Sequence, residues 1–325
     1  MWSIITEEDP RECPVLFLIF NRPEQTSRVF EQIRKFKPRK LFIAADGPRK
    51  GFVEDARKCL QTRNIVEQID WECNCVTLFR TENLGCKKSV SDAISWFFEN
   101  VDRGIILEDD CLPEPTFFRF CSDLLSAYRD DDRVALVSGF NPLATKMSSN
   151  EFRFSIYAGI WGWATWKRSW KHYDPCFDGL QEFLKSQKIK SILKTSPETE
   201  YWENILIKAA SENQNSWAYP WLYSWWKRGC LGIIPLSNLV KNIGFGGDAT
   251  HTIGCNQAFV SSYGQALFPL QMHSFDYDAE FDRLYARKIY LNEATSSQPT
   301  SVLKRKSRVA GLVNYFTNLL MTKNQ

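Results

Sequence analysis

The chain has 325 residues, enough to bury a sizeable core in one large domain or two smaller ones. Its 41 basic and 38 acidic residues leave a net charge of +3, which gives no electrostatic reason to expect a nucleic-acid partner. The ten cysteines are scattered, and together with only three histidines they match neither a zinc motif nor a redox pair. We therefore expect reduced thiols, as in a cytosolic protein.

The amino-terminal segment gives no indication of export. Residues 1–12 contain Glu7, Glu8 and Asp9 and no apolar stretch, so we expect no secretory signal. No later run approaches the length of a membrane-spanning helix. These features predict a protein that works on the cytoplasmic side of the membrane.

Short apolar runs alternate with amphipathic stretches through the first 140 residues. Each apolar run ends at polar or turn residues, which is typical of strands covered on both faces. Strands are predicted at 15–20, 40–45, 76–80, 104–107 and 134–138. Helices are predicted at 25–36, 52–69, from after Gly85 to Phe98, and at 117–128. This alternation predicts an α/β fold with a doubly wound, mostly parallel sheet.

Polar residues follow directly after four of the predicted strands. They are Asn21-Arg22, Asp46, Glu82-Asn83 and the run Glu108-Asp109-Asp110. Because parallel strands bring their carboxyl ends to one edge of the sheet, we expect these side chains to lie close together. Ligands of open α/β sheets bind at that edge. The sequence therefore predicts a functional site there.

The acidic run is the most informative of these motifs. Glu108, Asp109 and Asp110 close the apolar run 104–107, and as a bare buried cluster they would repel one another and lose hydration. A cation or a hydroxyl-rich ligand would complete the arrangement, and hard oxygen ligands suit Mg²⁺ or Mn²⁺, the usual partners of a diphosphate. The alternative is a solvated acidic turn with Asp110 or Thr116 as a helix cap.

The first predicted strand lacks a glycine-rich phosphate loop. Asn21-Arg22-Pro23 stands where a dinucleotide fingerprint or a P-loop would be found, so the dehydrogenase and kinase interpretations lose their main support. A nucleotide bound without such a loop needs a metal ion and side chains to neutralise its diphosphate. This requirement points again to Asp110.

Tryptophan becomes dense after about residue 142. Trp217, Trp221 and Trp225 recur every four residues, which is one face of a helix and favours a core role. In Trp161-Gly162-Trp163 the glycine would let the backbone approach a ligand closely, and both a functional and a structural role remain open.

Two later segments carry further hypotheses. Residues 243–252 combine three glycines with Asp248 and His251, which suits either a mobile active-site lid or a plain surface loop. From Ser301 onward, basic residues precede an apolar helical face. Such a basic amphipathic helix can lie on an anionic membrane, or it can dock on the domain or on a subunit.

Taken in order, these motifs resemble metal-dependent glycosyltransferases of the GT-A fold, and among them N-acetylglucosaminyltransferase I and its bacterial relatives, some labelled haemolytic proteins or family 2 glycosyltransferases. The resemblance covers roughly residues 12–290 and rests on the order of motifs that are weak alone. It implies a nucleotide-sugar-binding half at 1–145 and an acceptor-side half with a lid loop at 146–290, within one globular unit. The basic tail then occupies 291–325.

The resemblance also implies roles for individual residues. The donor would be a UDP-sugar, whose diphosphate is met by Mn²⁺ or Mg²⁺ at Asp110. Glu108 and Asp109 would hydrogen-bond the donor's sugar or ribose. Further donor-side positions implied in the same way are Asn21, Arg22, Asp46, Lys88 and His251 in the loop 248–252.

The position of the general base departs from the family pattern. An inverting transfer needs a carboxylate that takes the proton of the acceptor hydroxyl. Relatives of this type carry an aspartate in a segment that reads Trp217-Ala218-Tyr219 here, and alanine cannot accept a proton. Glu203, slightly preferred, or Asp248 would then serve. For Glu203 the alternative is an exposed helix carboxylate.

Three functions compete on this basis. The leading hypothesis is an inverting, metal-dependent glycosyltransferase that moves a sugar from a UDP-sugar to a glycan or glycolipid acceptor, in bacterial surface polysaccharide synthesis. The second, motivated by Ala218, is a non-catalytic protein that binds a nucleotide sugar or a glycan. A sugar-nucleotide pyrophosphorylase ranks last, because the chain lacks the glycine-rich, basic loop that such enzymes place after their first strand.

Overall fold

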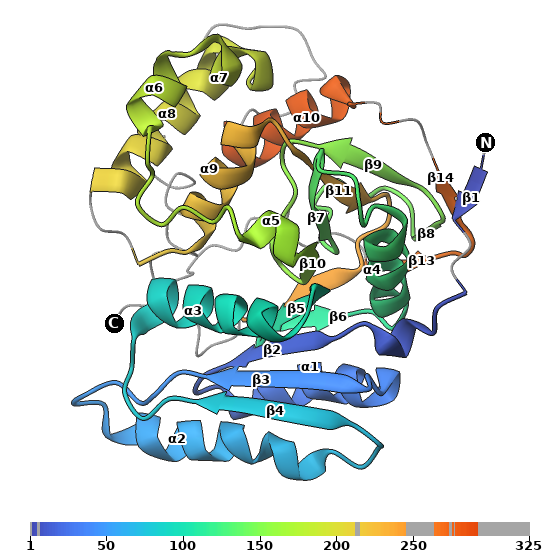
Figure 1. Ribbon diagram of the computed structural model, residues 1–325, viewed down its shortest axis with the longest axis vertical. Coiled ribbons are helices and arrows are strands. Elements are labelled where there is room, and N and C mark those ends of the chain that lie inside the picture. Colours follow the sequence, from blue (N-terminus) through green and yellow to red (C-terminus); the bar gives the residue numbers. More distant parts are fainter. Residues whose placement is uncertain are drawn as a thin grey trace, which may run out of the picture.

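The computed structural model describes residues 2–4, 7–211, 215–244, 263–272, 275 and 277–291. The protein has a mixed α/β fold built on a large, mostly parallel central sheet (Figure 1). Most of the predicted lid loop, with Asp248 and His251, lies outside the described residues, as does the predicted tail helix.

The central sheet has eight strands in the order β4-β3-β2-β5-β10-β7-β11-β9. In chain order these are β2 (Val15–Ile19), β3 (Lys40–Ala45), β4 (Asn74–Phe79), β5 (Arg103–Glu108), β7 (Val134–Ser138), β9 (Phe152–Ser155), β10 (Trp163–Trp166) and β11 (Leu231–Pro235). Strands β4, β3, β2 and β5 are parallel, as are β7 and β11. Strands β10 and β9 run antiparallel to their neighbours.

The five predicted strands are confirmed as β2, β3, β4, β5 and β7. All five residues of β2 and of β7 are buried, which explains why each reads as a continuous apolar run. The sequence analysis did not anticipate β10, which lies between β5 and β7. Its short segment has aromatic residues on both faces, so no period-two alternation of apolar and polar residues marks it as a strand.

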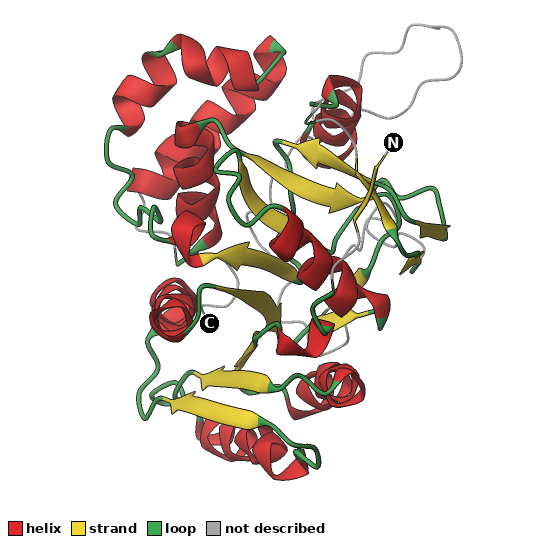
Figure 2. Ribbon diagram, turned by 45° about the vertical axis from the view of Figure 1, so that its right-hand side comes forward, coloured by secondary structure: helices red, strands yellow, loops and turns green. Residues whose placement is uncertain are grey.

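Helices cover both faces of the sheet (Figure 2). The rings of Phe36 and Phe118 stack with centroids 4.3 Å apart, which joins α1 to α4 on one face. On the opposite face, Trp170 of α5 donates a hydrogen bond to Ser95 of α3 at 3.0 Å. The helices are α1 (Pro23–Phe36), α2 (Val53–Arg63), α3 (Gly85–Asn100), α4 (Thr116–Ala127), α5 (Lys167–Trp170), α6 (Leu180–Lys185), α7 (Gln187–Ile192), α8 (Ser196–Ser211), α9 (Ala218–Arg228) and α10 (Ala279–Tyr285).

Short elements complete the described chain. They are the 3₁₀ helices η1 (Pro10–Glu12) and η2 (Asn64–Gln68), the π-helical turn η4 (Ala286–Tyr290), and three two-stranded pairs: β1 (Trp2–Ile4) with β14 (Leu270–Met272), β6 (Cys111–Pro113) with β12 (Val240–Asn242), and β8 (Ser148–Ser149) with β13 (Gln265–Ala266). None of the described helices combines the length and apolar character that crossing a bilayer requires. The predicted helix 52–69 is α2 followed by η2, so its last turn and a half is 3₁₀.

The tryptophan stripe of α9 is core, as predicted. Trp217, Trp221 and Trp225 are each at most 2% exposed. Trp217 stacks on Trp163 of β10 with ring centroids 5.6 Å apart, and Trp221 packs beside both. Helix α9 is therefore fixed to the central sheet through indole contacts.

A buried carboxylate holds α10 against the end of β9. Asp282 accepts hydrogen bonds from the hydroxyl of Ser155 and from the backbone N–H of Ile156, the latter at 3.1 Å. An ion pair of 2.6 Å between Arg153 and Asp278 supports the same contact. Burial raises the pKa of Asp282 to about 7, against the hydrogen bonds that lower it.

This anchor predicts a pH-dependent stability that the Asp282→Asn variant lacks. Between pH 3.8 and about 7 the folded protein holds a proton on Asp282 that the unfolded chain has released. The free energy of unfolding should therefore fall as pH rises through this window and level off above it. Urea unfolding at several pH values measures the slope, and an equal slope in both proteins would contradict the assignment.

Candidate functional site

The acidic run lies at the carboxyl end of β5, in the middle of the sheet. Glu108 is the last residue of β5 and is half-buried, whereas Asp109 and Asp110 are 4% and 8% exposed. Strand β2 pairs with β5 in parallel, so the segment that follows β2 ends beside these carboxylates. The structure thus brings together residues that the sequence separates by nearly 90 positions.

Arg22 supplies the positive charge nearest to this run. Its guanidinium Nη1 lies 2.8 Å from Oδ2 of Asp110 and 3.8 Å from Oδ1 of Asp109. Burial works to lower the pKa of Arg22, but the two carboxylates outweigh burial and hold that pKa above its usual value. The backbone N–H of Phe20 donates to Asp109 at 3.3 Å. The carboxylates are therefore stabilised from the end of β2.

Asn21, predicted as a donor-binding residue, is held by a neighbouring ion pair. Its side-chain amide donates to Asp55 at 2.8 Å. Asp55 is 4% exposed and also pairs with Arg49 at 2.7 Å. The contact joins the end of β2 to the first turn of α2. In this arrangement Asn21 fixes the loop geometry beside the site.

Asp46, also predicted on the donor side, accepts hydrogen bonds from the backbone N–H groups of Gly47, Leu84 and Gly85 at 2.9 to 3.2 Å. Burial raises its pKa, and these N–H bonds work in the opposite direction. A side chain on Gly47 would collide with the backbone of Glu82, so glycine permits the close approach of the two loops. Asp46 thus holds the amino terminus of α3 against the end of β3.

Two cavities open beside the acidic run. The first has a volume of about 110 Å³ and the second about 70 Å³. Glu108 and Cys86 line both cavities and form the wall between them, while Asp110 lines the first and Asp109 the second. The acidic run is therefore divided between two spaces, with Asp109 and Asp110 in the turn that joins β5 to β6.

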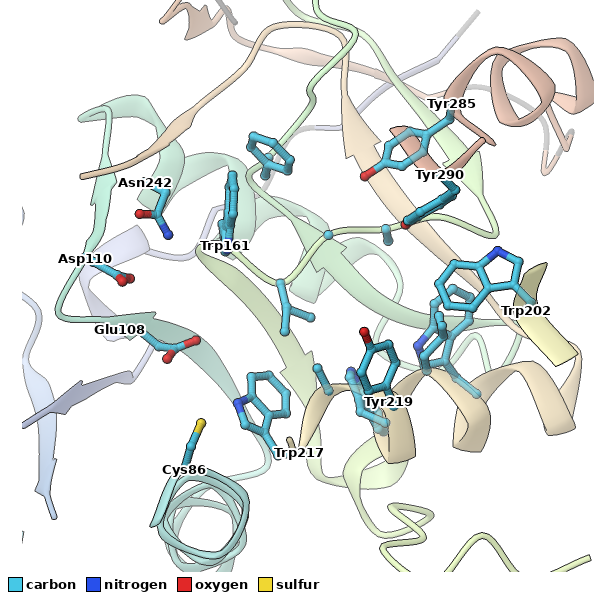
Figure 3. A pocket seen from close by; sticks show the side chains of 18 of the residues that line it. Cys86, Glu108, Asp110, Trp161, Trp202, Trp217, Tyr219, Asn242, Tyr285 and Tyr290 are labelled. Carbon is cyan, nitrogen blue, oxygen red and sulfur yellow. The ribbon is translucent and has the colours of Figure 1, made fainter. Parts of the chain in front are cut away.

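The first cavity has a polar end and an aromatic end (Figure 3). Glu108, Asp110 and Asn242 lie at the polar end. Ten of its 19 lining residues are aromatic: Phe140, Trp161, Tyr201, Trp202, Trp217, Tyr219, Trp221, Trp225, Tyr285 and Tyr290. Of the motif whose role the sequence leaves open, Trp161 lines the cavity, whereas Trp163 is a buried strand residue.

Tyrosine hydroxyls supply most of the polar atoms at the aromatic end. Burial raises the pKa of Tyr201 to about 12 and raises that of Tyr219 further. These hydroxyls therefore stay protonated at physiological pH and act as hydrogen-bonding groups, not as bases.

The donor set at the polar end fits a hard divalent cation in chemistry and charge. The acidic run carries three formal negative charges, and Arg22 contributes one positive charge beside it. Asp110 and Asn242 offer oxygens at the same end of the cavity. Within the described ranges, however, no three His, Cys, Asp or Glu side chains converge on one point. A cation there would take its remaining ligands from elsewhere.

Several predicted site residues are not brought to the cavities. Lys88 is exposed and pairs with Asp92 on the surface of α3 at 2.8 Å. Glu203 is half-buried on α8 and lines neither cavity, although its neighbours Tyr201 and Trp202 line the first. Lys88 lies in the first turn of α3, which a loop separates from the end of β4, and its side chain is exposed. Asp248 and His251 fall outside the described residues.

Other lining residues were missed by the sequence analysis. Cys86 was set aside with the scattered cysteines, and Asn242 precedes the glycine-rich loop without a strand signal of its own. Tyr285 and Tyr290 come from the last described elements of the chain, and no pattern links them to the acidic run. Only proximity in the folded chain identifies them.

Comparisons with known proteins leave the family open. No protein-family model and no curated protein matches the chain. Solved structures similar to it include an inositol-1-phosphate CTP transferase from T. maritima (10% identity, TM-score 0.37, covering 71% of this chain and 89% of that one). HddC from Yersinia pseudotuberculosis (9%, 0.29, 48% and 77%) and a cytidylyltransferase from Leptospira borgpetersenii (12%, 0.30, 62% and 71%) are also similar. At these TM-scores we base no functional conclusion on the likeness.

The Arg22 contact predicts a specific double-mutant result. Arg22→Met removes the guanidinium from two buried carboxylates and should lower the free energy of unfolding by about 3 kcal/mol, as for a broken buried pair. Adding Asp110→Asn removes one of the two carboxylate charges that Arg22 contacts, so the double variant should regain part of the lost free energy of unfolding. Urea denaturation at pH 7 measures both values. Strictly additive losses would contradict the pairing.

Proposed function

We propose that the protein is an inverting, Mn²⁺- or Mg²⁺-dependent glycosyltransferase of the GT-A type, which transfers a sugar from a UDP-sugar to a glycan or glycolipid acceptor in surface polysaccharide synthesis. The observation that carries this proposal is the placement of Glu108, Asp109 and Asp110 at the carboxyl edge of the sheet, where they divide between two cavities. Such an edge is where open α/β sheets bind their ligands.

The charges at this edge suit a nucleoside diphosphate. Arg22 has the planar guanidinium that binds phosphate oxygens, and it already lies beside the carboxylates. Asp110 would hold the divalent cation, which supplies stabilisation of the charge that develops on the leaving diphosphate. Glu108 and Asp109 would accept hydrogen bonds from hydroxyl groups of the donor. This assignment keeps the roles that the sequence predicts for all four residues.

The transfer requires three coupled changes. The acceptor hydroxyl oxygen forms a bond to the anomeric carbon from the face opposite the leaving group, and the bond from that carbon to the UDP oxygen breaks, so configuration inverts. UDP leaves with the electron pair, and the hydroxyl proton passes to a carboxylate. Of the two predicted bases, Glu203 has no place in the described cavity lining. Asp248 remains a prediction for that role.

A second candidate is a non-catalytic protein that binds a nucleotide sugar or a glycan. One observation favours it: Ala218, at the position where relatives place an acid, lines the first cavity. In the described lining of that cavity Glu108 and Asp110 are the only carboxylates. Both are assigned to the donor, which leaves the described lining without a separate base.

Asp110→Ala is the variant that tests the donor site. We expect it to abolish Mn²⁺-dependent binding of UDP-sugars, because the cation would lose its carboxylate, while thermal unfolding in the absence of ligand still shows a single cooperative transition. Isothermal titration calorimetry with a panel of UDP-sugars, with and without MnCl₂, measures the effect. Asp70→Ala is the matched control, since Asp70 is an exposed aspartate that pairs with Arg34 far from the cavities.

The two candidate functions differ in turnover. Release of UDP that depends on Mn²⁺ and on an added acceptor supports the transferase. Donor binding with no UDP release across a broad acceptor panel supports the binding protein. Unchanged donor affinity in Asp110→Ala would contradict the role of Asp110 in donor binding, which the transferase and the binding protein share.

A further inference from the structure

We infer that the aromatic end of the first cavity binds a compact, uncharged, apolar ring carried by the acceptor, so that the acceptor is a glycoside with a rigid apolar aglycone. We call this part of the cavity the aromatic compartment; its lining residues are Tyr201, Trp202, Tyr219, Trp225, Tyr285 and Tyr290. That the ring belongs to the acceptor rests on the proposed function. That the compartment binds such a ring rests on the cavity alone.

The layout of the cavity points to a two-part ligand. Glu108, Asp110 and Asn242 lie at one end, and Trp202, Tyr285 and Tyr290 lie at the other, with Tyr219 between them (Figure 3). The two carboxylates are assigned to the donor and its cation, so the attacking hydroxyl of the acceptor would lie next to them, whereas the ring faces beyond suit an apolar surface. A molecule that is polar at one end and apolar at the other matches both.

The charges of the described lining residues disfavour an anionic group in the aromatic compartment. No Lys, Arg or His lines the cavity in the described part of the chain, and its formal charges are the carboxylates of Glu108 and Asp110. The faces of aromatic rings also carry partial negative charge. A carboxylate or phosphate placed there would lose its hydration without gaining a cationic partner.

The compartment offers few hydrogen-bonding groups to a second sugar. Tyr285 and Tyr290 are hydrogen-bonded to each other, so their hydroxyls already serve as partners. The indole N–H groups of Trp202 and Trp221, two residues that line the cavity, are buried and have no acceptor within the described structure. Together with the hydroxyls of Tyr201 and Tyr219, these groups suit a ring with one or two polar atoms better than the several hydroxyls of a pyranose.

The size and burial of the cavity favour a ring over a long chain. A volume of about 110 Å³ corresponds to roughly seven to eleven water molecules, or on the order of 200–300 Å³ of ligand. That is the size of one sugar with one aromatic ring. At the far end Trp225 and Tyr285 are buried, at 2% and 1% exposed, and Tyr290 is half-buried.

Three matched glucosides test this inference. The probes are 4-nitrophenyl β-D-glucopyranoside, methyl β-D-glucopyranoside and 4-carboxyphenyl β-D-glucopyranoside, titrated by calorimetry in the absence of metal and nucleotide. We expect the nitrophenyl glucoside to bind at least tenfold more tightly than each of the other two. Equal affinity of the nitrophenyl and methyl glucosides would overturn the inference, and so would equal affinity of the carboxyphenyl glucoside.

Variants locate the binding in the compartment. Ala218→Leu adds side-chain volume to the cavity wall and should reduce the affinity for the nitrophenyl glucoside at least tenfold. Tyr201→Ser removes a half-buried ring from the wall and should act in the same direction, which keeps the test open if Ala218→Leu fails to fold. Ile207→Ala, on the exposed face of the same helix α8 as Tyr201, is the control and should bind as the wild type does. Loss of affinity in the control, or none in either cavity variant, would overturn the inference.

The outcome is independent of catalysis. Selective binding of the nitrophenyl glucoside without any UDP release would support the compartment and contradict the transferase. UDP release with equal binding of all three glucosides would support the transferase and contradict the compartment.

Discussion

The structure depends on the neutralisation of three consecutive carboxylates that end a central strand. Neighbouring carboxylates at a buried edge lose hydration and repel one another unless positive charge or hydrogen bonds compensate them. Arg22 supplies positive charge from the adjacent strand end. Under the proposed function, a divalent cation at Asp110 and the diphosphate that it accompanies would add to this compensation.

The second half of the chain supplies the aromatic wall of the first cavity, opposite the acidic run. Strand β10 enters the sheet antiparallel beside β5, and Trp163 on it packs against Trp217 and Trp221 of α9. Helix α9 is thereby held across from the acidic run, and its aromatic side chains form one wall. Asp282 holds α10 in place, so that Tyr285 and Tyr290 close the far end. Core packing and the cavity lining are thus made by the same indole and phenol rings.

Much of the first half could be predicted from the sequence, because its signals are local. The buried strands of a parallel sheet read as continuous apolar runs, and the polar residues after them had to meet at one edge, as Arg22 and Asp110 do. The second half could not be predicted in the same way. Strand β10 has aromatic residues on both faces, and Tyr290 reaches the cavity only through contacts distant in sequence. Lys88 was predicted from its closeness to a strand end, but it pairs with Asp92 on the surface of α3 and lines neither cavity.

The central claim is that the carboxylate of Asp110 holds a divalent cation that accompanies a diphosphate. Crystals soaked with MnCl₂ and UDP, measured at the manganese absorption edge, test it most directly. The account predicts one anomalous peak at coordination distance from Asp110, at the polar end of the first cavity, with the diphosphate of UDP beside it. UDP bound with no peak at Asp110, or a manganese ion bound only at other carboxylates, would contradict the claim.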